Sequence, residues 1–477
     1  MKKISAAVCL ILCLTMLLGS AGAQVQYDKM YVEDSRGTSM KAIPKTYLLE
    51  KAASIFGEEA LMLSDARDLF VAPNGHVYIA DAGSNCIVEL TGDLDLVRVY
   101  DNAASGGLKR PEGVFVDEYG SVYVADTGNA RIVKLDAQGN FVEEFGKPQS
   151  NLLEEDFVFN PRLVAVSSVG YIYALKYQYV MQMDAYNSFR GYIGTTEVGQ
   201  DIGYMIKYFF SNPEQRKVML KREPASCYSF DLGADGSIYV TTADRDSGEL
   251  KRINSVGKNI YPKKSAFGMM VRSETGTFLN PLYIDVAVDA YENVYMLEGT
   301  SGEISVYNSQ GDNLCVFGGK GETRETFQAP VALDVDDEMN IYILDQKYGG
   351  VKKFEPTRFM TLVYEALHLF DQGEYQKAEG YWQEILDRHE SYYLANVGMA
   401  KLKYKQKDYA ASMEYYRMAE DQEGYTTAFG KEEMVYFRDH FGQVVLIGAG
   451  VLAGLAAAVY VCQRFIRKKM DKYSHLI

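Results

Sequence analysis

The stretch GSVYVADTGNARIVKL, residues 120–135, decides the fold because its first half recurs along the chain. It contains a turn, an apolar strand with a central tyrosine, a second turn and another strand. The equivalent tyrosines of the six copies are Tyr78, Tyr123, Tyr173, Tyr239, Tyr295 and Tyr342, at intervals of 45, 50, 66, 56 and 47 residues. These intervals match or somewhat exceed the roughly 40–50 residues of one β-propeller blade, so six copies predict a mainly β fold with six blades.

Each repeat also supplies the other strands of its blade. Pro111, Pro161 and Pro330 all stand at the same distance before their tyrosines and mark the start of an innermost strand, where a missing N–H is tolerated. Two-residue alternation with turns between strands predicts four-stranded antiparallel blades. The sixth repeat has no fourth strand, and folds avoid unpaired edges. We therefore expect residues 47–57 to pair with residues 351–354 and close the ring.

Two apolar runs predict export and anchoring. Lys2 and Lys3 precede the first run, and small residues end it at Ala23, which is typical of a cleaved signal peptide. Lipid modification of Cys13 is a weaker alternative, because the bulky Leu12 precedes it. The second run, residues 444–462, has no charged residue over 19 positions and matches the roughly 20 residues of a membrane-spanning helix.

The basic residues after the second run predict its orientation. Arg464, Arg467, Lys468 and Lys469 follow it directly, and basic residues stay on the cytoplasmic side. We therefore expect a single-pass protein of the cell membrane with its large N-terminal domain outside the cell and a short cytoplasmic tail.

Between the propeller and the second run, the period becomes helical. Similar residues recur 34 positions apart, as in Ala366 with Ala400 and Tyr375 with Tyr409, a spacing typical of tetratricopeptide (TPR) repeats. The predicted division of the chain is a signal peptide (1–23), a lead-in (24–42), the propeller (43–356), a TPR-like helical domain (357–442), a transmembrane helix (443–462) and a basic tail (463–477).

Charge and cysteine content exclude two classes of protein. A formal net charge of −15 disfavours nucleic acid as a partner, because binding to phosphates depends on clustered Lys and Arg. Cys86, Cys227 and Cys315 are the cysteines outside the two apolar runs, and three cannot all pair. Each lies in an apolar strand-like run, so we expect them to be small buried hydrophobic residues rather than a disulfide framework.

Residues 120–135 resemble the signature of NHL-repeat proteins, and weaker variants recur across residues 47–356. The order of signal peptide, NHL-like propeller, short helical repeats and one span resembles surface proteins of Gram-positive bacteria that are associated with carbohydrate ABC transporters. That resemblance implies a membrane protein complex, such as an ABC transporter permease, as partner, together with the bilayer around residues 444–462.

NHL-like and related propellers include lactonases and amidating lyases with metals in the central channel. His76 is the only histidine in the propeller repeats, which excludes a zinc site made of several histidines. A divalent metal held by carboxylates remains open, but the expected ligand set cannot be assembled from the repeats. We expect no catalytic residue, no metal ligand and no cofactor.

Two sets of residues are candidates for ligand binding. The residue after the start of each inner strand should line the channel mouth. In blades one to four these are Arg67, Glu112, Arg162 and Tyr228, and the last two blades add Ile284 and Val331. Such a mouth is half polar and half apolar, which suits a sugar or peptide, although an ordinary ion-pair cluster is an equal alternative. The second set comprises the acids after the second strands, Asp81, Asp126, Glu298 and Asp345. They either form a ligand-binding rim or accept hydrogen bonds from nearby backbone amides.

Further contacts are expected outside the repeats. Residues 195–225 and 254–280 are longer than a blade requires, and long insertions tend to be functional. In the span, Gly450, Gly454 and Ala458 are four residues apart, a spacing that allows close helix packing. We expect a membrane-anchored binding or scaffold protein whose propeller recognises a glycan, a peptide or a protein. The alternative is a lactonase-type hydrolase or lyase with a carboxylate-bound divalent metal.

Overall fold

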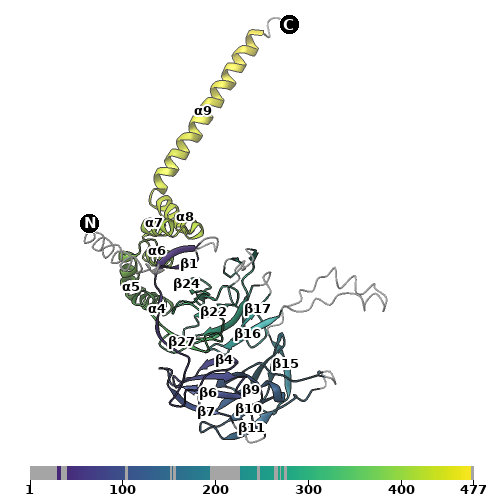
Figure 1. Ribbon diagram of the computed structural model, residues 1–477. Coiled ribbons are helices and arrows are strands. Elements are labelled where there is room, and N and C mark those ends of the chain that lie inside the picture. Colours follow the sequence, from purple (N-terminus) through teal and green to yellow (C-terminus); the bar gives the residue numbers. More distant parts are fainter. Residues whose placement is uncertain are drawn as a thin grey trace, which may run out of the picture. The chain divides into compact units, whose positions relative to one another are not determined.

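The computed structural model describes residues 29–473, apart from residues 34–39, 102–105, 151–152, 154–156, 194–225, 244–247, 263–266, 269 and 273–276. The chain divides into two compact units, residues 1–364 and 365–477. The first unit contains a six-bladed β-propeller and the second contains helices (Figure 1). The predicted signal peptide and the whole of the 195–225 insertion lie outside the described residues.

Blades one to three are four-stranded antiparallel sheets in which successive strands pair. Blade one contains β4 (Ala66–Val71), β5 (Val77–Asp81), β6 (Cys86–Leu90) and β7 (Leu96–Tyr100). Blade two contains β8 (Pro111–Val116), β9 (Val122–Asp126), β10 (Arg131–Leu135) and β11 (Phe141–Phe145). Blade three contains β12 (Leu163–Val166), β13 (Ile172–Lys176), β14 (Tyr179–Met183) and β15 (Phe189–Ile193).

The remaining blades depart from that plan. In the described part of the chain, the sheet of blade four has only β16 (Cys227–Leu232), β17 (Ile238–Thr242) and β18 (Leu250–Ile253), and a separate pair, β19 (Val271–Arg272) and β20 (Phe278–Leu279), follows it. Blade five contains β21 (Tyr283–Val288), β22 (Val294–Glu298), β23 (Glu303–Tyr307) and β24 (Asn313–Gly318). Blade six contains β25 (Pro330–Val335), β26 (Ile341–Asp345) and β27 (Gly350–Pro356).

The six inner strands close into a ring. The first strand of each blade contacts the first strand of the next, and β25 of blade six contacts β4 of blade one. The core fills the spaces between blades. One apolar cluster, for example, joins Val77 and Val88 of blade one to Leu344 and Val351 of blade six. Each blade therefore buries both of its faces, which explains why the second strands read as almost continuous apolar runs.

The predicted closure of the ring is confirmed for residues 47–53, whereas residues 54–57 lie beyond the paired strand. β3 (Tyr47–Ala53) runs antiparallel to β27 and supplies the fourth strand of blade six. The pairs extend from Tyr47 opposite Pro356 to Ala53 opposite Val351, with one bulge. The three cysteines also behave as predicted, since Cys86, Cys227 and Cys315 are buried free thiols.

The segment before β3 differs from the prediction of a plain lead-in. Residues 29–44 contain a hairpin, β1 (Lys29–Glu33) and β2 (Met40–Pro44), which extends blade five to six strands in the order β2-β1-β24-β23-β22-β21. In the part of the chain that the structure describes, the ladder between β1 and β24 consists of Tyr31 opposite Val316, while Val32 of β1 and Ile43 of β2 are buried. The hairpin adds to a sheet edge that forms far along the chain, so no local sequence pattern could reveal it.

The second unit continues from α4 (Arg358–Asp371) with α5 (Tyr375–Arg388), α6 (Tyr393–Lys405), α7 (Tyr409–Met418), α8 (Gln422–Asp439) and α9 (Phe441–Tyr473). The 34-residue repeat is visible in its turns. Gly373 and Lys407 both have positive φ values, 81° and 64°. Phe370 packs edge-on against Tyr375, and Tyr404 packs in the same way against Tyr409. α9 is long and apolar enough to cross a membrane, by length and composition alone.

Candidate functional site

The four predicted rim acids are buried and engaged with backbone amides. Asp81 accepts hydrogen bonds from the backbone N–H groups of Ser64 at 2.9 Å and Asp65 at 2.8 Å. Asp345 accepts in the same way from Gln328 at 2.8 Å and Ala329 at 2.9 Å. In each case the carboxylate fixes the loop that enters the inner strand of its own blade.

The other two rim acids follow the same rule. Glu298 accepts from the backbone N–H of Leu282 at 2.9 Å, and Asp126 accepts from that of Lys109 at 2.7 Å. Asp126 also receives the Arg131 guanidinium at 2.8 Å. All four carboxylates are at most 2% exposed. The sequence left two roles open for these acids, and the structure shows the second, in which they accept hydrogen bonds from nearby backbone amides. They therefore stabilise the loops that lead into the inner strands.

The predicted mouth residues share an unusual backbone position. In five inner strands the pairing register shifts across them, at Arg67, Glu112, Tyr228, Ile284 and Val331. Each is the extra residue of a β-bulge. Bulges occur beside functional sites because they redirect a side chain away from the regular ladder.

The structure brings only two of the charged mouth residues together. Arg162 lies with its Nε 3.8 Å from a carboxylate oxygen of Glu112, and Arg110 approaches the other oxygen at 3.2 Å. Arg67 instead pairs with Asp65 at 2.8 Å. The Arg67 and Arg162 side chains are nearly half exposed, so their guanidinium groups remain accessible. Tyr228, Ile284 and Val331 are half-buried, which gives blades four to six the more apolar part of this set.

The channel itself contains four aspartates that the sequence analysis did not single out, Asp68, Asp231, Asp285 and Asp334. They line a cavity of about 40 Å³ to which all six inner strands contribute. Phe70, Phe115 and Leu163 form part of its apolar wall. Each aspartate also accepts a hydrogen bond, of 2.6–2.9 Å, from the backbone N–H of another blade's inner strand. The pairs are Asp68 with Val114, Asp231 with Val288, Asp285 with Leu333, and Asp334 with Val71.

Burial changes the acidity of these aspartates. Desolvation raises the pKa of Asp231 to about 7 and that of Asp285 to about 6. It also raises the pKa values of Asp68 and Asp334, and the negative charges of neighbouring aspartates act in the same direction. Crowded carboxylates in a small cavity resist full ionisation, because each charge opposes the next. The channel therefore holds protons more strongly than ordinary aspartates would.

A larger hollow lies beneath the N-terminal hairpin. Its volume is about 920 Å³, and its walls come from β1, β2, the end of β24 and the loop at residues 318–326. Met30, Tyr31 and Met40 line it from the hairpin, while Val316 and Phe317 line it from β24. A second hollow of about 400 Å³ shares Met40, Glu303 and Val316 with the first. We call the two together the hairpin cleft.

The hairpin cleft combines apolar surface with a few charged groups. Lys320 and Arg324 supply positive charge, and Glu303 and Glu325 supply negative charge. Glu325 also pairs with Lys45 at 3.2 Å. Small-molecule sites are typically hollows of this mixed character and comparable size, and methionine side chains adapt to irregular ligands. Sequence reasoning missed the cleft because it exists only when the hairpin joins blade five.

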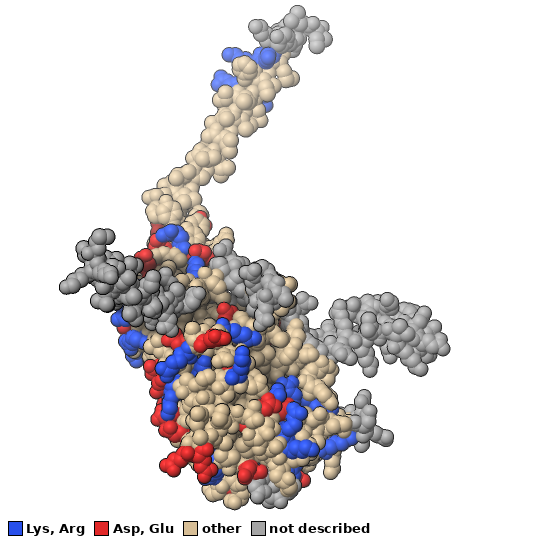
Figure 2. Space-filling model, viewed as in Figure 1, with Lys and Arg blue, Asp and Glu red and all other residues tan. Residues whose placement is uncertain are grey.

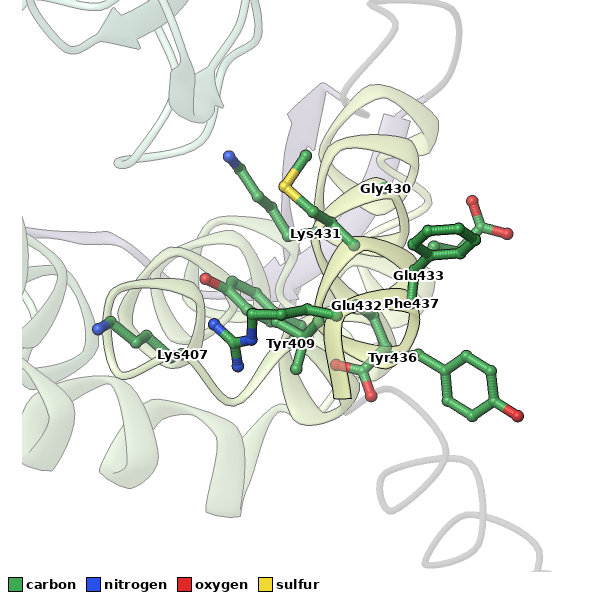
Figure 3. Close-up of a pocket in the computed structure, with 11 residues that line it drawn as sticks. Lys407, Tyr409, Gly430, Lys431, Glu432, Glu433, Tyr436 and Phe437 are labelled. Atoms are coloured by element: carbon green, nitrogen blue, oxygen red, sulfur yellow. The ribbon is translucent and has the colours of Figure 1, made fainter. Parts of the chain in front are cut away.

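A third hollow, of about 1270 Å³, lies in the helical unit around α8 (Figure 3). Lys407 and Tyr409 line it together with residues 430–438. It is an open surface around one helix rather than a cleft between elements, so it is a weaker candidate for a small ligand. Gly450, Gly454 and Ala458 lie along α9 with their surfaces exposed.

Metal-ligating side chains are the next feature expected from the alternative function, and they would come from His, Cys, Asp and Glu of the described ranges. Within the described ranges, no three of them gather in an arrangement that could hold a metal ion. The channel aspartates, the nearest approach to such a set, use oxygen lone pairs to accept from backbone N–H groups.

Comparison with known proteins gives no family. No protein-family model matches the sequence, and no curated protein matches it. Virginiamycin B lyase from Staphylococcus aureus is similar in structure at 12% identity, covering 65% of this chain and 99% of the lyase, with a TM-score of 0.41. A gluconolactonase from Xanthomonas campestris is similar at 12% identity, covering 62% of this chain and 87% of the lactonase, with a TM-score of 0.39.

A third similar structure is the extracellular domain of a one-component system from Bacteroides thetaiotaomicron, at 12% identity. The match covers 70% of this chain and 38% of that protein, with a TM-score of 0.38. Likenesses this distant, to a lyase, a lactonase and an extracellular domain alike, do not determine a function. The sites of this chain are the better guide to what it does.

Proposed function

We propose that the protein is a membrane-anchored, extracytoplasmic binding protein whose propeller recognises a glycan or peptide and couples it to a membrane complex. The observation that carries this proposal is the hairpin cleft, about 920 Å³ in its main part and lined by Tyr, Met and Phe side chains with charged residues at hand. A hollow of this size holds a disaccharide or a short peptide, and its few charged groups would orient the ligand against an apolar surface. The bulged residues at the channel mouth offer a second polar surface for a larger ligand.

The channel supports binding rather than chemistry. Its four carboxylates each bridge to another blade through a backbone N–H, as Asp334 does to Val71 at 2.6 Å. These carboxylates hold neighbouring blades together, and the cavity of about 40 Å³ that they line has room for little more than water. We therefore propose no enzymatic activity and no cofactor.

The anchor would be α9. Its apolar side chains are exposed along the helix, and Figure 2 shows basic side chains gathered towards its far end. Basic residues are retained on the cytoplasmic side, so the propeller would lie outside the cell. The 34-residue helical hairpins, which we take to be TPR-like, and the small residues Gly450, Gly454 and Ala458 would serve contacts with a membrane partner such as an ABC transporter permease.

Ligand binding is tested with the full chain in detergent, using arrays of bacterial glycans and of peptides as probes. Met40→Glu places a charge in the hairpin cleft, whereas Met62→Glu places one at a well-exposed site outside the residues that line it. Met40→Glu should weaken binding by about tenfold or more, since burying an unpaired charge costs more than about 1.4 kcal/mol, and Met62→Glu should leave binding unchanged. Equal effects of the two variants, or no binding to any probe, would refute the proposed site.

Topology is tested separately on intact cells. External protease should release propeller fragments while an epitope attached after residue 477 stays protected. Protection of the propeller instead would contradict the extracytoplasmic assignment, whatever the ligand experiment shows.

A further inference from the structure

α8 has an aromatic face that no described element covers. On one side it packs against α7, where Gly424 fits beneath the Tyr416 ring and Ala428 is fully buried beside Ala400. Elsewhere around the helix, large side chains stand in solvent. Tyr436 is 63% exposed and Phe437 is 52% exposed. The outer face of a terminal helix is normally polar, so this face requires an explanation.

The exposed aromatic residues form a continuous strip. Tyr425 and Phe429, both partly exposed, stack with parallel rings one turn apart. At about 100° per residue, Tyr436 falls within about 20° of both of them around the helix. Figure 3 shows Tyr436 and Phe437 projecting from α8 on the side away from Lys407 and Tyr409. We call Tyr425, Phe429 and Tyr436, which share one side of α8, the aromatic strip; Phe437 lies about 100° from Tyr436 around the helix.

The strip is connected to α9 almost without a break. His440 alone separates the two helices. Its backbone N–H donates to Tyr436, and its carbonyl accepts from the N–H of Val444. The imidazole of His440 stacks on Tyr436 at 4.2 Å, and Phe437 of α8 packs against Phe441 of α9 at 6.0 Å. The end of α8 therefore cannot move far from the start of the apolar helix.

Distance along the chain then fixes where the strip lies. The uncharged run begins at Val444, and Phe441 precedes it by three residues, or about 4.5 Å of helix. The headgroup layer on each side of a bilayer is about 5–8 Å thick. If α9 spans the membrane, Phe441 lies within that layer and the C-terminal end of α8, at Asp439, lies at its outer edge. Amphipathic aromatic rings favour this layer.

We propose that α8 lies on the outer surface of the bilayer, with its aromatic strip inserted among lipid headgroups. The inference rests on the proposed membrane anchoring and extends it, because it fixes the orientation of the helical unit as well as its attachment. Glu433 falls on the same side of the helix and would meet the polar headgroups. The strip would thus hold α8 parallel to the membrane surface and set the distance between the helical repeats and the bilayer.

The test places a tryptophan probe on each side of α8 at nearly the same chain position. Tyr436→Trp lies in the strip, and Arg438→Trp lies about 160° away around the helix. Val451→Trp, within the apolar run, reports on insertion of α9. The natural Trp382 is buried, and its emission is subtracted with the unsubstituted chain. Each full-length variant is reconstituted into phosphatidylcholine vesicles that contain lipids brominated near the headgroup or near the chain end.

The expected result is that shallow bromines quench Tyr436→Trp by about twofold or more relative to Arg438→Trp, as for an interfacial helix, and that deep bromines quench Val451→Trp. Quenching of Val451→Trp with equal, weak quenching of the two α8 probes would overturn the inference while leaving the anchor intact. A strip probe shielded from both lipid and aqueous quenchers would also overturn it, because another protein surface would then cover the strip. Absence of quenching at Val451→Trp would refute the anchoring itself.

Discussion

β3 and the β1–β2 hairpin are neighbours in sequence, but they join neighbouring blades in very different ways. β3 pairs with β27 along its whole length, and its Tyr47 is 1% exposed. Among the described residues, the hairpin has one ladder pair with β24, Tyr31 opposite Val316; Tyr31 is 43% exposed, although Val32 beside it is buried. Both segments extend a sheet edge, yet one seals the fold and the other leaves a cleft.

The difference shows how one stretch of chain can serve both stability and recognition. A full ladder satisfies the backbone groups of an edge strand and buries its side chains, so it contributes to global stability. A short ladder contributes little and leaves room for a ligand between the added hairpin and the blade. Segments of low local stability are where binding motions occur.

The largest effect is expected from disrupting the pairing of β3 with β27. A methyl group at Gly350 in β27 would lie 2.0 Å from the backbone oxygen of Ala53 in β3, and a backbone atom cannot move aside cheaply. Gly350→Ala should therefore destabilise the propeller by about 3–5 kcal/mol. Maleimide labelling of the buried thiols of Cys86 and Cys315 in urea would measure the loss. Gly146→Ala is the control, because an added methyl group there would meet nothing within 4 Å, and it should change the free energy of unfolding by no more than about 1 kcal/mol.

The second effect is a pH dependence of stability at the junction of blades five and six. The hairpin extends blade five, and β3 extends blade six. Asp285 of blade five accepts a hydrogen bond from the backbone N–H of Leu333 in blade six at 2.7 Å, and burial raises its pKa to about 6. Because the folded-state pKa exceeds the unfolded value of about 3.9, Asp285 favours the fold most below about pH 4 and loses that contribution as pH rises to about 6.

Replacement of this carboxyl by a neutral amide isolates its contribution. The free energy of unfolding of the unsubstituted chain minus that of Asp285→Asn should fall by about 2–3 kcal/mol between pH 4 and pH 7. The same thiol-labelling experiment at several pH values measures it. A constant difference across this range would show that Asp285 does not titrate there.

The smallest effect compares two tyrosine hydroxyls. The hydroxyl oxygen of Tyr47 in β3 lies 2.6 Å from the hydroxyl oxygen of Tyr364. The hydroxyl oxygen of Tyr364 lies 2.9 Å from that of Tyr295. Tyr47→Phe should cost about 1–1.5 kcal/mol, because it leaves a buried hydroxyl without one partner. Tyr31→Phe in the exposed β1 should cost nearly nothing. Equal costs in thermal unfolding would indicate that the hairpin is as firmly held as β3.

The sequence predicts the features that repeat. The tyrosine spacing yields six blades, and the missing fourth strand of the last repeat identifies the closing strand, since both depend on one unit copied along the chain. The loop-fastening role of Asp81 and its equivalents was among the predicted alternatives, because aspartates in turns have few other partners.

The parts that could not be predicted arise from contacts between distant segments. The hairpin is stabilised by a sheet edge far along the chain, and residues 24–42 carry no tyrosine repeat. Two of the channel aspartates were missed because the repeat pattern points to Arg67 and Ile284. The β-bulge at each of these positions makes the next residue, Asp68 or Asp285, line the cavity instead. A signal was present, since an aspartate within an apolar inner strand, as in YIDVAV at residues 283–288, is a buried polar group that needs a structural reason.

Hydrogen exchange of the full chain, resolved by peptide, tests most directly whether β3 seals the ring while the hairpin remains free to move. The amides of β3 that pair with β27 should exchange at least about 100-fold more slowly than those of β1, reflecting a difference in opening free energy of about 2.7 kcal/mol or more. Addition of a bound glycan or peptide should slow exchange in the hairpin and in the loop at residues 318–326, which line the cleft, and not in β3. Equal protection of β3 and β1 without ligand would contradict the account.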